Sequence, residues 1–246
     1  MSHHYLDVRD LRYAYPDGTE ALKGVSFRLE HGEACALVGA NGAGKSTMML
    51  ALTGLILPSG GTMDVGGTVL SKKTAADVRR RIGFVFQDSE DQLFMPTVFD
   101  DVAFGPGNLG LTPAEVDARV HEALEAVGMS EYAGRPPHHL SFGQRRRVAV
   151  ATVLAMRPEI LVLDEPSSNL DPASRRELAE ILTALDVTIL MVTHDLPYAM
   201  QLCERSVVLA NGVIVADGPT REVLSNAPLM ATHRLELPFG FDPTRV

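Results

Sequence analysis

The sequence of 246 residues lacks any apolar run that approaches the ~18 residues needed to cross a bilayer as a helix. Its longest apolar stretches, at 50–57 and 187–192, have the length of core segments. It contains only two cysteines, which excludes a disulfide-based scaffold. It also lacks internal repeats, linkers and low-complexity segments, so repeat arrays and disordered scaffolds are excluded as well.

Basic residues are outnumbered, with 22 Lys and Arg against 31 Asp and Glu and a formal net charge of −9. A nucleic-acid partner would favour a basic face, so this balance argues weakly against one but leaves room for a local basic patch. The hydrophobic fraction of 46% is usual for a globular protein. Adjacent His138 and His139 have no carboxylate or cysteine beside them and make a poor metal site.

A glycine-rich segment at 39–47 matches the G-x-x-x-x-G-K-[ST] spacing of a phosphate-binding loop. Residues 34–38 before it are apolar and predict a buried parallel strand, and a helix is expected to begin near Lys45. Glycines let successive backbone N–H groups point at one anion, and the helix dipole adds to the attraction. Lys45 suits the β- and γ-phosphates, and the Ser46 hydroxyl suits Mg²⁺. The predicted ATP-binding residues of this loop are Gly39, Ala40, Asn41, Gly42, Ala43, Gly44, Lys45, Ser46 and Thr47.

A second apolar run, at 160–163, ends in Asp164 and Glu165. Beside a phosphate loop, Asp164 suits the coordination shell of Mg²⁺, and Glu165 suits a base that polarises the attacking water. The alternative is a strand that ends in a solvated acidic turn. Ser141, followed by glutamine at position 144, forms a capping box, so another helix N-terminus suited to an anion is expected there. A well-capped helix without a ligand would give the same pattern.

The order of patterns along the chain predicts an α/β protein. Residues 5–30 alternate as antiparallel strands do, and 34–90 alternate between strand and helix patterns, as in parallel sheets. Residues 92–157 are mostly helical in pattern. After that, strands and helices return, with a hairpin signal at Asn211 and Gly212. The expected division is a nucleotide-binding, RecA-like core with an antiparallel β subdomain at 1–91 and 158–246, and a helical subdomain at 92–157.

Together, the phosphate loop, the acidic strand end and residues 140–144 resemble the nucleotide-binding domain of ATP-binding-cassette proteins over nearly the whole chain. The family's signature motif is LSGGQ, from which Phe142 departs and in which Gly143 is kept. In that family two chains pack head to tail, and the signature helix of one faces the ATP held by the other. The resemblance implies an α/β P-loop NTPase cassette fold with an antiparallel β subdomain and a helical subdomain. It also implies ATP contacts in trans from Ser141, Gly143, Gln144 and Asp171.

Other residues follow the same family pattern in order. Tyr15 has the spacing of the aromatic that stacks on adenine, although a plain strand aromatic is the alternative. Gln87 resembles the glutamine that reaches Mg²⁺ and the attacking water and senses the transport partner. His194 resembles the histidine that contacts the γ-phosphate, whereas a lone histidine after a strand is usually a cap or surface residue. The resemblance thus implies ATP and Mg²⁺ as cofactors, with Glu165, His194 and Gln87 as catalytic residues and Ser46, Gln87 and Asp164 as Mg²⁺ ligands.

A finer resemblance is to the ATPase subunits of energy-coupling-factor importers, carried by residues 15–19, 87–94 and 101–106. Residues 140–144 and 168–172 are most similar to the cobalt and nickel branch. This implies an ATP hydrolase that powers import of a transition-metal ion, with cobalt first, from the cytoplasmic face of the cell membrane as a peripheral protein. The implied partners are integral-membrane scaffold and substrate-binding subunits and a second ATPase subunit, with a homodimer expected and a heterodimer open.

In importers of this kind, a helix of the scaffold subunit inserts beside the glutamine that Gln87 resembles. Leu93 and Phe94 are therefore expected to line a docking groove, and packing into the chain's own core is the alternative.

Other functions fit the sequence less well. Nickel, biotin or another vitamin is the alternative cargo. A soluble cassette ATPase of DNA repair or translation is more remote, because such proteins usually carry long coiled-coil or tandem-domain insertions. A switch GTPase would need a guanine-specificity motif, which is not found. A non-catalytic scaffold is disfavoured because Lys45, Glu165 and His194 are all present.

Overall fold

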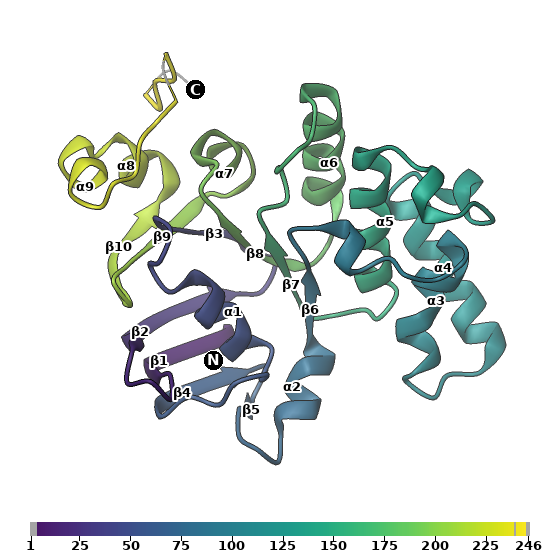
Figure 1. The fold of residues 1–246 in the computed structure, drawn as a ribbon, viewed down its shortest axis with the longest axis horizontal. Helices are drawn as coiled ribbons and strands as arrows, with labels where there is room; N and C mark the ends of the chain where they lie inside the picture. The colour runs from purple at the N-terminus through teal and green to yellow at the C-terminus, as the bar shows by residue number, and fades with distance from the viewer. Residues whose placement is uncertain (1–3, 239, 245–246) are drawn as a thin grey trace.

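The computed structural model describes residues 4–238 and 240–244, which form two sheets with helices packed around them (Figure 1). The first sheet has the strand order β2-β1-β4-β5, and the second has the order β10-β9-β3-β8-β7-β6. The strands are β1 (His4–Ala14), β2 (Glu20–Glu30), β3 (Ala34–Val38), β4 (Gly60–Val65), β5 (Thr68–Val69), β6 (Ile82–Val85), β7 (Ile160–Asp164), β8 (Thr188–Thr193), β9 (Arg205–Ala210) and β10 (Val213–Pro219).

The helices alternate with the strands of the second sheet along most of the chain. The α-helices are α1 (Lys45–Leu52), α2 (Ala75–Arg81), α3 (Val98–Gly107), α4 (Pro113–Ala126), α5 (Phe142–Leu154), α6 (Pro172–Ala184), α7 (Leu196–Leu202), α8 (Thr220–Ser225) and α9 (Ala227–Thr232). Short 3-10 turns lie at η1 (Ser89–Asp91), η2 (Ser130–Tyr132) and η3 (Pro137–His139). Within the described part of the chain, no helix combines the length and the apolar character that crossing a membrane requires.

The first sheet is antiparallel, which confirms the prediction for residues 5–30: β1 pairs with β2 on one side and with β4 on the other. In the second sheet, β9, β3, β8, β7 and β6 run parallel. The predicted hairpin is also confirmed, because β9 and β10 pair antiparallel around Asn211 and Gly212. Both turn residues have positive φ, 50° and 80°, as a tight hairpin between right-twisted strands requires.

The second sheet is buried on both faces, and successive residues of its strands enter two different cores. Leu37 packs toward α1, α2 and the antiparallel sheet, whereas its neighbour Ala36 packs toward α3–α7. This alternation follows from the period of two along a strand. It explains why the strands are apolar throughout rather than at every second position.

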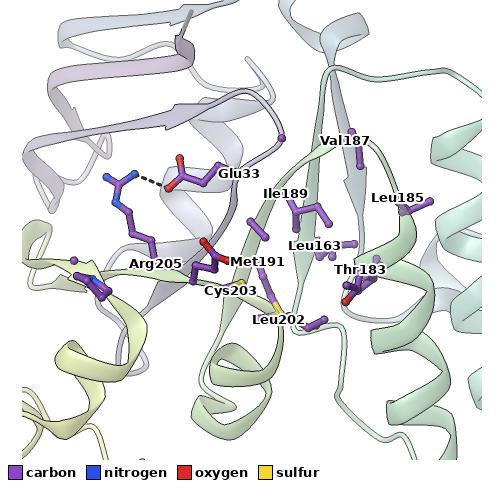
Figure 2. Close-up of a pocket in the computed structure, with 16 residues that line it drawn as sticks. Glu33, Leu163, Thr183, Leu185, Val187, Ile189, Met191, Leu202, Cys203 and Arg205 are labelled. Atoms are coloured by element: carbon purple, nitrogen blue, oxygen red, sulfur yellow. Dashed lines mark hydrogen bonds and ion pairs between the residues drawn. The ribbon is translucent and has the colours of Figure 1, made fainter. Parts of the chain in front are cut away.

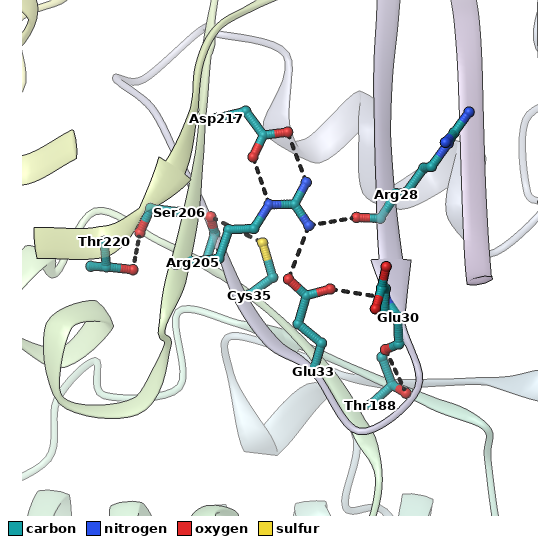
Figure 3. Close-up of polar contacts among 10 residues, drawn as sticks. Arg28, Glu30, Glu33, Cys35, Thr188, Arg205, Ser206, Asp217 and Thr220 are labelled. Carbon is teal, nitrogen blue, oxygen red and sulfur yellow. Dashed lines mark hydrogen bonds and ion pairs between the residues drawn. The ribbon is translucent and has the colours of Figure 1, made fainter. Parts of the chain in front are cut away.

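Arg205, at the start of β9, ties the two sheets together (Figure 3). Its Nε and Nη2 donate to the carboxylate of Asp217 on β10 at 2.6 and 2.7 Å. Its Nη1 donates to the carbonyl oxygen of Arg28 on β2 and to Glu33, just before β3, both at 2.9 Å. These bonds, led by the pair with Asp217, raise the pKa of Arg205. One guanidinium thus joins the antiparallel sheet to the edge of the parallel sheet.

The helices α3, α4 and α5 pack on one another beside the free edge of the parallel sheet (Figure 1). The predicted capping box of Ser141 and Gln144 begins α5, and a second capping box, of Thr112 and Glu115, begins α4. The boundaries of a helical subdomain at 92 and 157 stay a prediction. At the other end of the chain, α8 and α9 form a small cover over β9 and β10.

Candidate functional site

The register of three parallel strands brings the predicted site residues to one edge of the sheet. Val38, the last residue of β3, lies opposite Thr193, the last residue of β8. Asp164, the last residue of β7, lies opposite Val192. The loop after β3, the carboxylates after β7 and His194 after β8 therefore leave the sheet side by side. Ligands of open parallel sheets bind at this carboxyl edge.

The predicted phosphate loop joins β3 to α1, which begins at Lys45 as expected. Gly44 has φ of 109°, and a Cβ there would lie 2.7 Å from the carbonyl oxygen of Ala21. A Cβ on Gly39 would lie 2.4 Å from the carbonyl oxygen of Leu209. Both glycines are thus required by close backbone approach as well as by the turn itself.

Lys45 is bent back over this loop. Its Nζ donates to the carbonyl oxygens of Gly39 at 2.5 Å and Ala40 at 3.2 Å. Burial lowers the pKa of Lys45, and the charges of Glu165 and Asp164 oppose that change. The ammonium group is therefore held inside the loop and faces the two carboxylates.

A cleft of about 450 Å³ lies over the loop and collects most of the predicted ligands. The Tyr15 side chain enters it from the turn after β1, and its hydroxyl lies 2.9 Å from the Thr47 hydroxyl. The predicted adenine-stacking ring and the two carboxylates thus line the same cleft. The predicted site residues that line the cleft are Tyr15, Asn41, Gly42, Gly44, Lys45, Ser46, Thr47, Gln87, Asp164 and Glu165.

Glu165 is buried and has φ of 44°, an uncommon backbone conformation for a residue with a side chain. Its carboxylate accepts bonds from the Thr193 hydroxyl at 2.8 Å and from the backbone N–H of His194 at 3.1 and 3.2 Å. The Nδ1 atom of His194 lies 2.6 Å from the same carboxylate. The end of β8 therefore fixes Glu165 from three sides, and the strained backbone persists because these contacts determine it.

Asp164 is a partly buried carboxylate that lies beside Glu165. Burial, with repulsion from Glu165, raises the pKa of Asp164 to about 6, and Lys45 and Arg146 only partly oppose this. Two neighbouring carboxylates facing one ammonium group leave an excess of negative charge in the cleft. Such a site favours a cation.

The predicted ligands within residues 140–144 and 168–171 do not reach this cleft. Ser141 and Gln144 exchange bonds at the start of α5, with Ser141 Oγ accepting from Gln144 N at 3.2 Å. Gly143 lies against α6, where a Cβ would be 2.5 Å from the Ser174 hydroxyl oxygen. Asp171 caps α6 by accepting from Ala173 N at 2.9 Å and Ser174 N at 3.1 Å. The two segments form one joint surface apart from the phosphate loop of the same chain.

Sequence reasoning missed several residues of the site. Thr193 holds Glu165, but a threonine at the end of an apolar strand carries no motif. Asn211 and Gly212 line the cleft, although their pattern predicted only a hairpin. Arg146 is one of three consecutive arginines, a pattern that a solvated helix face would also give, yet its side chain is fully buried. Only the placement of the helix, which buries one face and exposes the other, distinguishes Arg146 from the two arginines beside it.

A second cavity, of about 500 Å³, lies at the opposite edge of the parallel sheet (Figure 2). It lies among the starts of β3, β8 and β9 and the ends of α6 and α7, and Leu163, Met191 and Cys203 contribute apolar walls. Burial raises the pKa of the Cys203 thiol well above its ordinary value, so this group is unreactive at neutral pH. None of the predicted site residues lines this cavity.

Comparison with known proteins agrees with this arrangement. The profile of the ABC transporter family matches residues 22–168. An ABC transporter ATP-binding protein of Streptomyces avermitilis is 66% identical over 98% of this chain and 92% of the relative. The energy-coupling factor transporter ATP-binding protein EcfA of Methanothermobacter thermautotrophicus is 47% identical over 95% of this chain and 76% of the relative.

Two solved structures share the fold. The first is cbiO1 from Clostridium perfringens, described as part of the ABC transporter complex cbiONQ, with a TM-score of 0.85, 38% identity and 96% of each chain covered. The second is the ATP-binding cassette MJ0796, a dimer in a post-hydrolysis state with ADP and phosphate. It has a TM-score of 0.76 and 28% identity over 87% of this chain and 98% of that one.

The raised pKa of Asp164 leads to a prediction about the free energy of unfolding. Above pH about 6 the folded protein carries an ionised, poorly solvated Asp164, whereas below its ordinary pKa of 3.8 the group is protonated whether folded or unfolded. Asp164→Asn should therefore raise the free energy of unfolding at pH 8 by roughly 1–2 kcal/mol, because water screens part of the effect. The gain should shrink as the pH falls through 6.

Urea unfolding of the ligand-free chain at several pH values measures this gain. Asp77→Asn on the exposed face of α2 is the matched control and should show no such pH-dependent gain. A destabilised Asp164→Asn at pH 8 would contradict the charge excess inferred for the cleft.

Proposed function

The chain belongs to the ABC transporter family of ATPases, and on that premise we propose that it is the ATP-hydrolysing subunit of an energy-coupling-factor importer. The proposed cargo is a transition-metal ion, cobalt, with nickel, biotin or another vitamin as alternatives. The observation that carries the proposal is the likeness to cbiO1, which extends over 96% of both chains. Relatives named EcfA support the same class of importer. A soluble cassette ATPase of DNA repair or translation is the remote alternative.

The residues present fit ATP and Mg²⁺. The loop offers N–H groups and the Lys45 ammonium to phosphates, and Tyr15 offers a ring to the base. The negative excess at Asp164 would be offset by a divalent cation, which Asp164, Ser46 and Gln87 would hold. Bound there, Mg²⁺ would neutralise charge on the phosphate oxygens during transfer.

Glu165 is the proposed general base and His194 its positioning partner beside the terminal phosphate. The Glu165 carboxylate lines the cleft while bonds from Thr193 and His194 fix its direction. A carboxylate held in this way can accept a proton from a water that attacks in line with the leaving group. His194 is not among the residues that line the cleft, but its side chain is 67% exposed and its ring lies against Glu165, which does line it.

Ser141, Gly143, Gln144 and Asp171 are proposed to act in trans. They share one surface formed by the first turns of α5 and α6, apart from the cleft of their own chain. The first turn of α5 presents N–H groups that suit an anion. A second copy of the chain, packed head to tail, would bring this surface to the cleft and complete two sites. The dimeric state of the related MJ0796 cassette supports this arrangement.

The proposed partners in the membrane dock on an exposed aromatic patch formed by Phe94 and Phe104, which are 63% and 49% exposed. The rings of Phe94 and Phe104 meet edge to face, 5.1 Å apart. Exposed aromatic side chains that lie together are typical of a binding anchor. The protein would then act as a peripheral subunit on the cytoplasmic face of the cell membrane.

Leu93 differs from Phe94, with which it was expected to line a docking groove. Its side chain is half-buried and packs on the core formed with α3–α7. The docking proposal therefore rests on the phenylalanines, with the helices at 92–157 as the proposed helical subdomain that carries them.

Transport of cobalt should depend on Glu165. In cells that express the chain with the membrane subunits of an energy-coupling-factor importer, uptake of radiolabelled cobalt should fall about 10²-fold in Glu165→Gln, because the variant keeps the shape of the base but not its basicity. ATP binding by the purified variant should persist. Uptake of biotin or nickel without cobalt would replace the proposed cargo, and Glu165-independent uptake would remove the proposed role of the chain.

The trans arrangement predicts complementation. Neither Ser141→Arg nor Lys45→Ala homodimers have an intact site, whereas a mixed dimer has one intact site and one doubly damaged site. Random mixing should restore ATP hydrolysis to about a quarter of the wild-type rate, since half of the dimers are mixed and each has one site. No recovery in the mixture, with both variants folded and the Ser141→Arg chain still binding ATP, would contradict action in trans.

Docking at the aromatic patch predicts a selective loss of assembly. Phe94→Asp with Phe104→Asp should leave folding and ATP binding intact while the chain no longer co-purifies with its membrane subunits, since two charges replace the proposed anchor. Leu55→Asp is the matched control, because Leu55 is 64% exposed outside the patch. Normal assembly of the double variant would rule out docking there.

A further inference from the structure

Arg146 is the largest fully buried side chain among the described residues, and it lies on α5 two residues after the capping Gln144. Its Nη1 donates to the carbonyl oxygen of Phe86 at 2.6 Å, and its Nη2 donates to the carbonyl oxygen of Gln87. Within the described part of the chain, its Nε has no partner. A cation held by two backbone carbonyls rather than by a carboxylate is costly to bury, so its position calls for a function.

Gln92 provides a second link between the same two segments. Its Oε1 accepts from the backbone N–H of Phe86 at 3.0 Å. Its Nε2 donates to the carbonyl oxygen of Ala149 at 2.8 Å and to the Thr152 hydroxyl at 2.7 Å, both on α5. The backbone of Phe86 is thus bonded to α5 on both sides, through its N–H by way of Gln92 and through its carbonyl oxygen by Arg146.

Phe142 lies against this link. Its ring centre lies 5.6 Å from the guanidinium carbon of Arg145 and 5.8 Å from that of Arg146. A cation near an aromatic ring in a partly dry site is stabilised by the ring's charge distribution. Phe142 occupies a position that is glycine in the signature motif that residues 140–144 resemble. Its departure from that motif therefore coincides with the buried arginine beneath it.

We propose that Arg146 is a positioning residue that fastens Gln87 to the first turn of α5, so that Gln87 and residues 141–144 move as one unit, with Phe142 packed against the link. This rests on the proposed function, in which Gln87 serves the cleft of its own chain and residues 141–144 serve the partner's cleft. A displacement of Gln87 would then be transmitted to the other site of the dimer through two guanidinium bonds rather than through the intervening loop.

Hydrogen–deuterium exchange on the full-length chain tests the link without any ligand. In Arg146→Met, the amides of 86–92 should exchange about tenfold faster, while those of the parallel sheet keep their wild-type rates. Arg146→Lys should recover part of the protection, because an ammonium group can still reach one of the two carbonyls. Arg176→Met, whose side chain is 68% exposed on α6, is the control for loss of an arginine and should change neither segment.

Kinetics separate positioning from folding. Arg146→Met should keep the KM for ATP within about threefold and lower kcat about tenfold or more, with Arg146→Lys between it and wild type. Gln92→Ala removes the second link without leaving a buried charge unpaired, and it should raise exchange at 86–92 in the same direction. If Arg146→Met fails to fold, this variant decides the matter.

Wild-type exchange at 86–92 in a folded Arg146→Met would overturn the proposal, as would faster exchange spread evenly over the whole parallel sheet. If Arg146→Met does not fold, wild-type exchange in Gln92→Ala would overturn it. Gln87→Ala separates a failure of the proposed role of Gln87 from a failure of the proposed role of Arg146. If it leaves turnover unchanged, the proposed role of Gln87 fails, while the exchange result still decides whether Arg146 holds this segment to α5.

Discussion

The parallel register of β3, β8 and β7 is the constraint on which the site depends. With Val38 opposite Thr193 and Asp164 opposite Val192, the phosphate loop, the two carboxylates and His194 leave the sheet at neighbouring points of one edge. A shift of one residue in β7 would send Asp164 to the opposite face, because side chains alternate along a strand. The strands are apolar on both faces, so two cores hold this register at once. The positions of the chemical groups at this edge are therefore fixed by the packing of the two cores behind it.

The elements with local signals could be predicted from the sequence, and the contacts between distant segments could not. The phosphate loop, the hairpin at Asn211 and the capping boxes depend on residues within a few positions of one another, and the structure has all of them. Thr193 beneath Glu165 and Phe86 beside Arg146 join segments 28 and 60 positions apart. Neighbours in sequence also separate in space: Phe94 is exposed while Leu93 packs on the core, since only the orientation of the turn decides between them.

The cleft contains charged side chains whose burial does not favour folding. Asp164 and Glu165 stand side by side with Lys45 as the facing cation, and the pKa of Asp164 rises to about 6 because burial and its neighbour both disfavour its charge. The Glu165 carboxylate accepts bonds from the end of β8. One carboxylate is thus held in a fixed direction, while the other is left short of positive charge. That difference fits a proton acceptor beside a cation ligand, the two roles that the family chemistry assigns to adjacent acids.

The predicted ligands are divided between two surfaces, so the proposed mechanism needs two chains. A chain whose cleft lacks the α5 surface holds half of each proposed site, so the free energy of nucleotide binding is available for bringing two chains together. Gln87 lies in the cleft while its backbone is bonded to α5, whose first turn does not line that cleft. Under the proposed function, a change at Gln87 would therefore reach the surface that completes the partner's site. The buried guanidinium makes this connection short, and Gln92, which also bonds to α5, lies two residues before Phe94 of the aromatic patch. Under the proposed function, a membrane subunit docked on that patch would act on both sites of the dimer through a single helix.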